Sequence, residues 1–324
     1  MKKTKKLLAC LIAAATMFTM GSTAFAADTT PTDQETVTVK KVYMLTNEGT
    51  TSPAETFTLE QVGKGSVSDS EATTAPDLGT ITGAEFAKGA ATVDGTTGNI
   101  TVALPAYDNV GIYEYTLREV AGTKAGVNYY GNDIKLKVTV VNGTNGKLRI
   151  AAVHTESTGK KSDSFVNTYS AGTLDISKTV EGNLGDKDKY FEFKVTLRGV
   201  EGKTYEESYA VTGGSEGASN PTSIKIGEET TFKLKHGDTI SIKNLPYGVS
   251  YTVTETAAAG YTTTRNGDDS TVNAADQKVE FTNTRTGDVD TGVNLTTLPY
   301  ILVFAGVIVI AGAAFITRRR KYED

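Results

Sequence analysis

The stretch IKLKVTVVNGTNGKLRIAAV, residues 134–153, decides the fold class of this chain. Apolar and polar residues alternate on both sides of a centre rich in Gly and Asn, which is typical of two short strands joined by a turn. The stretch TTFKLKHGDTISIKNLPYGVSYTVTE, residues 230–255, repeats this organisation. Because such segments recur at short spacing, the sequence predicts an all-β fold made of antiparallel, immunoglobulin-like sandwiches.

The length of the chain, 324 residues, suits roughly two domains of ordinary size. Its aromatic residues are 15 Tyr and 11 Phe with no Trp, and this mix favours half-buried strands. We therefore predict two tandem β-sandwich domains, at residues 27–171 and 172–287. They would join at the short segment SAGT, Ser170–Thr173, and so short a junction predicts an end-to-end rod.

The N-terminus has the features of an export signal. Four lysines precede an apolar run, and Ala24-Phe25-Ala26 forms a small-x-small cleavage site, so residues 1–26 are predicted to be removed between Ala26 and Ala27. The only cysteine, Cys10, lies within this segment. An exported protein without disulfides must stabilise its domains by other means.

The charge of the chain is unevenly distributed. Removing the eight basic residues of the two ends and the two acidic residues of the tail leaves 25 basic and 36 acidic residues between 27 and 291, a net charge of −11. So acidic a region argues against a nucleic acid as partner.

Three short motifs occur once in each predicted domain. The segment YTLRE, residues 115–119, matches YTVTE, residues 251–255, and FVNT, residues 165–168, matches FTNT, residues 281–284. Upstream of each pair lies a strand-like segment that carries a lysine, VTVKKVY in the first domain and LDISKTV in the second. Lysine and glutamate are separated by 78 residues in one copy and 77 in the other, which indicates an internal repeat.

The polar residues of these motifs lie at positions that strand alternation assigns to the apolar face. They are Lys41, Glu119 and Asn167 in the first copy and Lys178, Glu255 and Asn283 in the second. Burial of such groups is costly unless they are paired, so the matched sets predict buried partners. The alternative is that they are edge residues and lysines whose amines reach back to solvent.

A lysine, a glutamate and an asparagine in an apolar core suit an intramolecular isopeptide bond. Burial favours the neutral amine, which is a nucleophile, and the asparagine carbonyl is its electrophile. A protonated glutamate could hydrogen-bond that carbonyl and shuttle the proton that lets ammonia leave. The reaction occurs once, within the domain itself, so this chemistry does not make the chain an enzyme.

With these motifs the first copy resembles the streptococcal pilin isopeptide-linkage domain, and the second is similar to collagen-adhesin B-type repeats. The whole chain resembles the two-domain T-antigen type of sortase-assembled backbone pilin. The resemblance implies a Lys41–Asn167 bond with Glu119 as the catalytic acid, and a Lys178–Asn283 bond with Glu255.

The C-terminal segment, residues 288–324, contains an apolar run and a basic tail. Tyr300–Ile316 is long enough to reach the lower limit for a membrane span, and RRRK follows it. A plain single-span anchor is one interpretation. The pentapeptide Asp288–Gly292 also resembles the motif recognised by Gram-positive sortases, with Asp290 in place of the usual Pro. That resemblance implies cleavage between Thr291 and Gly292 after a transient membrane span.

A polymerised pilin needs a lysine that accepts the next subunit. In the resembled family this residue precedes the last strand of the first domain, where the sequence STGKKSDSFVN offers Lys160 and Lys161. Spacing by two from Phe165 and Asn167 predicts that Lys161 faces the core side and Lys160 points outward. We favour Lys161 and keep Lys160 beside it. The alternative is a loop with two solvated lysines.

The sequence predicts no metal site and no cofactor. Its two histidines, His154 and His236, have no cluster of possible ligands around them. We therefore predict a shaft pilin attached to a Gram-positive cell surface. Its partners would be a pilus-specific sortase, identical subunits, tip or base minor pilins and peptidoglycan. The alternative is a cell-wall-anchored adhesin or stalk protein that is not polymerised.

Overall fold

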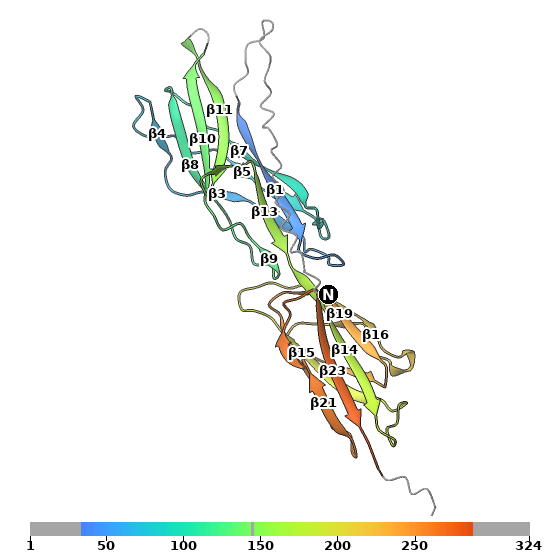
Figure 1. Cartoon of the computed structure of the whole chain (residues 1–324). Helices are drawn as coiled ribbons and strands as arrows, with labels where there is room; N and C mark the ends of the chain where they lie inside the picture. The colour runs from blue at the N-terminus through green and yellow to red at the C-terminus, as the bar shows by residue number, and fades with distance from the viewer. Residues whose placement is uncertain (1–33, 144–145, 288–324) are drawn as a thin grey trace, which may run out of the picture.

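The computed structural model describes residues 34–143 and 146–287. The described residues form β-strands and a short 3₁₀ helix, η2 (Glu216–Ala218), so the predicted all-β fold is confirmed. Two sandwiches lie end to end along an elongated molecule, as expected from the short junction (Figure 1). Among the described residues there is no helix with the length and apolarity needed to cross a bilayer. The predicted signal, residues 1–26, and the tail, residues 288–324, lie outside the described ranges.

The first domain contains a five-stranded sheet, in the order β5-β7-β1-β13-β9, and a sheet in the order β12-β11-β10-β8-β3 with β4 beside β8. The strands β2 and β6 form a separate pair. The strands are β1 (Thr36–Leu45), β2 (Glu55–Phe57), β3 (Leu59–Gln61), β4 (Ser66–Ser68), β5 (Ile81–Thr82), β6 (Ala84–Phe86), β7 (Thr96–Ala103), β8 (Gly111–Glu119), β9 (Val127–Asn128), β10 (Ile134–Asn142), β11 (Leu148–Ser157), β12 (Lys160–Lys161) and β13 (Ser164–Tyr169).

The second domain contains sheets in the orders β17-β16-β19-β14-β23-β21 and β18-β15-β20-β22. Its strands are β14 (Ala171–Glu181), β15 (Phe191–Arg198), β16 (Tyr209–Gly213), β17 (Ser223–Ile224), β18 (Glu229–Leu234), β19 (Thr239–Pro246), β20 (Ser250–Glu255), β21 (Thr262–Asn266), β22 (Asp269–Thr271) and β23 (Asp276–Thr284).

The alternation of apolar and polar residues becomes an alternation of burial. In β10 the side chains from Ile134 to Val140 are buried at every second position, and β11 pairs with β10 in antiparallel register. The apolar faces pack into one core per domain. In the first core the rings of Tyr43, Phe57 and Phe86 meet edge to face, with centroids 5.0–5.6 Å apart.

Most strand pairs are antiparallel, but in both domains the first and last long strands are parallel neighbours. The strand β1 pairs with β13 in the first domain, and β14 pairs with β23 in the second. Parallel strands cannot be joined by a tight turn. The chain between the first and last strands of each domain must therefore cross over before it returns. This arrangement places the opening and closing motifs of each domain side by side.

The two domains are joined by more than the chain connection. The backbone N–H of Ala125 donates to the Thr204 carbonyl oxygen at 3.0 Å, and the Thr204 N–H donates to Thr123 at 2.9 Å. The Asn244 side chain accepts a hydrogen bond from the Thr51 N–H at 2.8 Å and donates to the Thr51 carbonyl at 2.9 Å. These contacts fix the relative orientation of the domains at two separate places.

Candidate functional site

The first domain contains a buried cluster of Lys41, Glu119 and Asn167, whose exposed fractions are 1%, 5% and 0%. The Lys41 amine donates to Asn167 Oδ1 at 2.6 Å and to Glu119 Oε2. The Asn167 amide nitrogen donates to Glu119 Oε1 at 2.5 Å. The three side chains therefore form a closed ring of contacts.

Three strands from both sheets position this cluster. Lys41 lies on β1 and Asn167 on the parallel neighbour β13, whereas Glu119 is the last residue of β8 in the other sheet. The backbone N–H of Tyr130 donates to Glu119 Oε1 at 3.2 Å, and the rings of Phe57 and Tyr130 lie 5.3 and 5.7 Å from the amine. The role of the Tyr130 backbone was not predicted, because every residue carries an N–H and the sequence contains no signal for this one.

The second domain contains the corresponding cluster of Lys178, Glu255 and Asn283. Lys178 and Asn283 are 1% and 0% exposed, and the Glu255 side chain is 2% exposed. The Lys178 amine donates to Glu255 Oε2 at 2.8 Å, and the Asn283 amide nitrogen donates to Glu255 Oε1. In contrast to the first cluster, Asn283 Oδ1 is buried without a hydrogen-bond partner.

The structure thus brings each predicted set of three together, in the same arrangement in both domains. Lysine is on the first strand, asparagine on the parallel last strand, and glutamate at the end of a strand in the other sheet. The alternative in which the lysines extend to solvent is wrong, because both side chains are at most 1% exposed.

Burial shifts both lysines towards the neutral form. The pKa of Lys41 is lowered from its usual 10.5 mainly by burial, which outweighs the opposing charge and hydrogen bond of Glu119. The pKa of Lys178 is lowered in the same way, against the hydrogen bond and charge of Glu255. An amine that loses its proton more easily is a better nucleophile near neutral pH.

The carboxylate in each cluster connects the amine with the amide. One oxygen contacts the lysine nitrogen and the other contacts the asparagine nitrogen, so the glutamate lies between a nucleophile and a leaving group. This differs from the expected contact of glutamate with the asparagine carbonyl. The observed arrangement suits transfer of a proton from the amine to the departing nitrogen.

The two candidate linking lysines form the edge strand β12, and both are exposed. Lys161 lies opposite Glu156 of β11, whose side chain is on the outer face, whereas Lys160 lies opposite the buried Ser157. The prediction that Lys161 faces the core side was therefore wrong. The chain leaves β12 after Lys161 and joins the other sheet at Ser164, so spacing from Phe165 does not carry over.

The last positions named from the sequence are the two cleavage sites and the two histidines. Ala26, Ala27, Thr291 and Gly292 lie outside the described residues. His154 contacts Glu156 at 3.0 Å, and His236 Nδ1 accepts the Val180 N–H at 3.0 Å. Within residues 34–143 and 146–287, no three His, Cys, Asp or Glu side chains are grouped so that they could hold a metal ion.

Two family profiles match the chain. Residues 37–170 match the Spy0128-like isopeptide containing domain, and residues 172–285 match a domain of unknown function, DUF7601. A pilin of Streptococcus pyogenes serotype M1 is 27% identical over 237 residues, which cover 66% of this chain and 69% of that protein. The pilus tip adhesin Cpa of Streptococcus pyogenes is 36% identical over 94 residues, which cover 29% of this chain and 13% of the adhesin.

Solved structures share the fold of the whole described region. The major pilin of Streptococcus pyogenes superposes with a TM-score of 0.54 at 24% identity, covering 79% of this chain and all of that chain. The T3.2 major pilin of the same species gives a TM-score of 0.50 at 22% identity, covering 78% and 99%. The chain is therefore similar in sequence to a streptococcal pilin, its first sandwich matches the isopeptide containing domain, and its fold is that of the streptococcal major pilins.

Proposed function

We propose that this chain is a structural subunit of a pilus shaft, held together by two kinds of amide bond: self-formed ties within each domain and sortase-made links between subunits. The two buried clusters are the observation that carries the first part. Each contains a nucleophile with a lowered pKa, an amide electrophile and a carboxyl group that contacts both nitrogen atoms. Unreacted, such clusters would leave charged or polar groups at a cost in the core.

In each domain the neutral lysine amine attacks the asparagine side-chain carbonyl carbon. A new C–N bond forms, the bond to the amide nitrogen breaks, and glutamate carries the proton from the attacking nitrogen to the leaving ammonia. Lys41 and Asn167 would form the first tie with Glu119, and Lys178 and Asn283 the second with Glu255. Because the glutamate contacts both the lysine and the asparagine in each domain, the reacting groups are held close together and the reaction gains a high effective molarity.

The ties would let each domain bear a pulling force without unfolding the strands between its first and last strand. Both join a first strand to its parallel last strand, so a force on the chain ends passes through the tie and bypasses the other strands. The first tie closes a loop between residues 126 positions apart. By analogy with a disulfide that closes a loop of about 100 residues, the loss of unfolded-state entropy contributes about 4–5 kcal/mol.

Intact-mass measurement of residues 27–287 tests the ties. We expect a mass lower than the sequence formula by two ammonia molecules. Glu119→Ala should restore one of them and Glu255→Ala the other, because each removes one proton carrier. Peptide mapping of both variants is the control that locates the remaining tie. A wild-type mass equal to the unmodified formula would contradict the proposal.

The inter-subunit links would use the C-terminal motif and β12. A sortase, which is a cysteine transpeptidase, would cleave between Thr291 and Gly292 and hold the Thr291 carbonyl as a thioester. The Lys161 amine of another subunit would attack it, forming an amide and releasing the thiol. Support comes from the exposed edge position of Lys161 and its place on the outer face of the sheet. The last subunit would be joined to peptidoglycan in the same way.

The alternative role, a surface adhesin attached singly to the cell wall, has one supporting observation, the match of 94 residues to a pilus tip adhesin. Sortase-dependent ladders on denaturing gels distinguish the roles. For a shaft pilin we expect a high-molecular-weight ladder that disappears in Lys161→Arg and persists in Lys160→Arg. A ladder that survives both substitutions combined would rule out β12, and the lack of any ladder in the native organism would favour the adhesin.

A further inference from the structure

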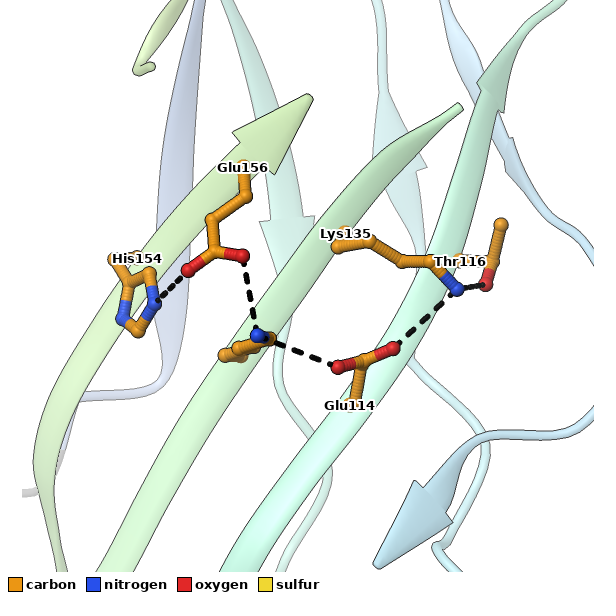
Figure 2. Close-up of polar contacts among 6 residues, drawn as sticks. Glu114, Thr116, Lys135, His154 and Glu156 are labelled. Carbon is orange, nitrogen blue, oxygen red and sulfur yellow. Dashed lines mark hydrogen bonds and ion pairs between the residues drawn. The ribbon is translucent and has the colours of Figure 1, made fainter. Parts of the chain in front are cut away.

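A row of alternating charges crosses the first domain (Figure 2), in the sheet whose edge strand is β12. It starts on β11, continues through β10 and ends on β8. Its contacts are His154 Nε2 to Glu156 Oε1 at 3.0 Å, Lys137 Nζ to Glu156 Oε2 at 3.1 Å, Lys137 Nζ to Glu114 Oε2 at 3.5 Å, Lys135 Nζ to Glu114 Oε1 at 3.3 Å and Lys135 Nζ to Thr116 Oγ1 at 2.7 Å.

Glu156, at one end of this row, is the direct cross-strand neighbour of Lys161. Side chains so paired have Cβ atoms about 5 Å apart, and opposite charges in such positions usually attract. Yet Glu156 makes no ion pair with Lys161. One of its carboxylate oxygens contacts His154 and the other contacts Lys137.

Asp163, a second acidic residue near Lys161, is also in an ion pair with another residue. Asp163, two positions further along the chain, pairs with Lys40 at 3.3 Å. Within residues 34–143 and 146–287, neither the Lys161 amine nor that of its neighbour Lys160 makes a hydrogen bond or an ion pair. Both lysines of β12 thus lack an acidic partner among the described residues although Glu156 and Asp163 lie nearby, because these two carboxylates pair with other residues.

We propose that Lys137, together with His154, is a positioning residue for inter-subunit linking, because it holds the Glu156 carboxylate away from the Lys161 amine. This inference rests on the proposed function of Lys161. The amine must be neutral to attack the thioester, and a carboxylate in contact with it would stabilise the protonated form instead. An amine without an acidic partner is also free to reach the thioester.

The direction of the local pKa shifts agrees with this geometry. The hydrogen bonds from Lys137 and His154 lower the pKa of Glu156. Its carboxylate is therefore favoured in the ionised form that pairs with these two residues. The hydrogen bond with Glu156 raises the pKa of Lys137, which therefore remains a cation. Both shifts favour the ionised form of the Glu156–Lys137 pair.

The test measures the reactivity of Lys161 without sortase. Wild-type protein and variants are treated with a small N-hydroxysuccinimide ester at mildly alkaline pH, and acylation of Lys161 and Lys160 is followed by peptide mass spectrometry. In Lys137→Met we expect Lys161 to react about two- to fivefold more slowly relative to Lys160, the range that one exposed ion pair produces. The freed Glu156 would cause this loss, so Lys137→Met/Glu156→Gln should restore the wild-type rate.

Lys194→Met is the matched control. Lys194 forms a comparable exposed pair with Glu229 at 3.0 Å on the second domain, and its removal should leave Lys161 unchanged. An unchanged Lys161 rate in Lys137→Met, or a loss that Glu156→Gln does not restore, would overturn the proposal. The presence or absence of the ladder in Lys161→Arg reports separately on whether Lys161 makes the link, so failure of the proposed function is distinguishable from failure of this inference.

Discussion

Lys41 and Lys178 illustrate how a core accommodates a lysine. Both lie almost wholly inside, both have an aromatic ring within 5.3 Å of the amine, and both contact a buried glutamate. Burial lowers the pKa of each lysine, whereas the charge and hydrogen bond of the glutamate raise it. Burial has the larger effect in both cases. A lysine that would be a defect in an inert core is the nucleophile of the tie proposed for each domain.

This balance predicts a pH-dependent stability in the variant that cannot form the first tie. In Glu119→Ala, Lys41 remains buried without its acidic partner, so its folded-state pKa lies below 10.5. Between the lowered pKa and 10.5 the unfolded chain binds more protons, so the free energy of unfolding rises with pH by up to about 1.4 kcal/mol per unit.

Urea denaturation at several pH values measures this slope. Lys41→Met/Glu119→Ala lacks the titrating amine and is the control for all other groups. The single variant should gain stability relative to the control as pH rises through that window. Parallel curves would show that Lys41 keeps its ordinary pKa in the fold.

Among the elements, β14 and β23 remain in close contact just beyond their C-terminal ends. Just after β14, Gly182 has a φ of +87°, and a Cβ there would overlap the Arg285 carbonyl oxygen beyond β23. The Arg285 N–H donates to the Glu181 carbonyl at 3.0 Å. Only a glycine fits both the left-handed backbone and this close approach.

We therefore expect Gly182→Ala to destabilise the second domain more than Gly227→Ala does. Gly227 has nearly the same φ, +85°, but nothing lies within 4 Å of its would-be Cβ. The control costs about 1–2 kcal/mol for the left-handed conformation alone. Gly182→Ala adds a steric clash worth about 1–3 kcal/mol. Equal losses in denaturant unfolding would mean that β14 and β23 can separate at this end without cost.

Strand parity predicted the inward positions of the six cluster residues, but it failed at Lys161. Parity holds only while the chain stays in one strand. Between Lys161 and Ser164 the chain passes from one sheet to the other, and the backbone N–H of Lys40 donates to Asp163 at that crossing. The spacing of residues alone contains no sign of this change.

At the scale of the whole molecule, the strands of the two domains follow one another with almost no linker. The strand β13 ends at Tyr169 and β14 starts at Ala171, so the closing strand of the first domain leads directly into the opening strand of the second (Figure 1). Lys88 pairs with Glu206 at 2.5 Å across the junction, in addition to the Asn244 contacts. A rod with a braced junction suits a subunit that transmits tension along a shaft.

The sequence by itself determined the all-β fold and the residue types of the two candidate sites. Alternation and turn residues are local properties, and a lysine, glutamate or asparagine on an apolar face is visible in any strand pattern. Only the tertiary structure decided which of these residues touch. Lys41 and Asn167 are 126 positions apart, and their contact depends on the order and facing of sheets, as does the pairing of Glu156 with Lys137 instead of Lys161. Such contacts form when the whole sandwich packs, because packing, unlike alternation, joins residues without regard to their distance along the chain.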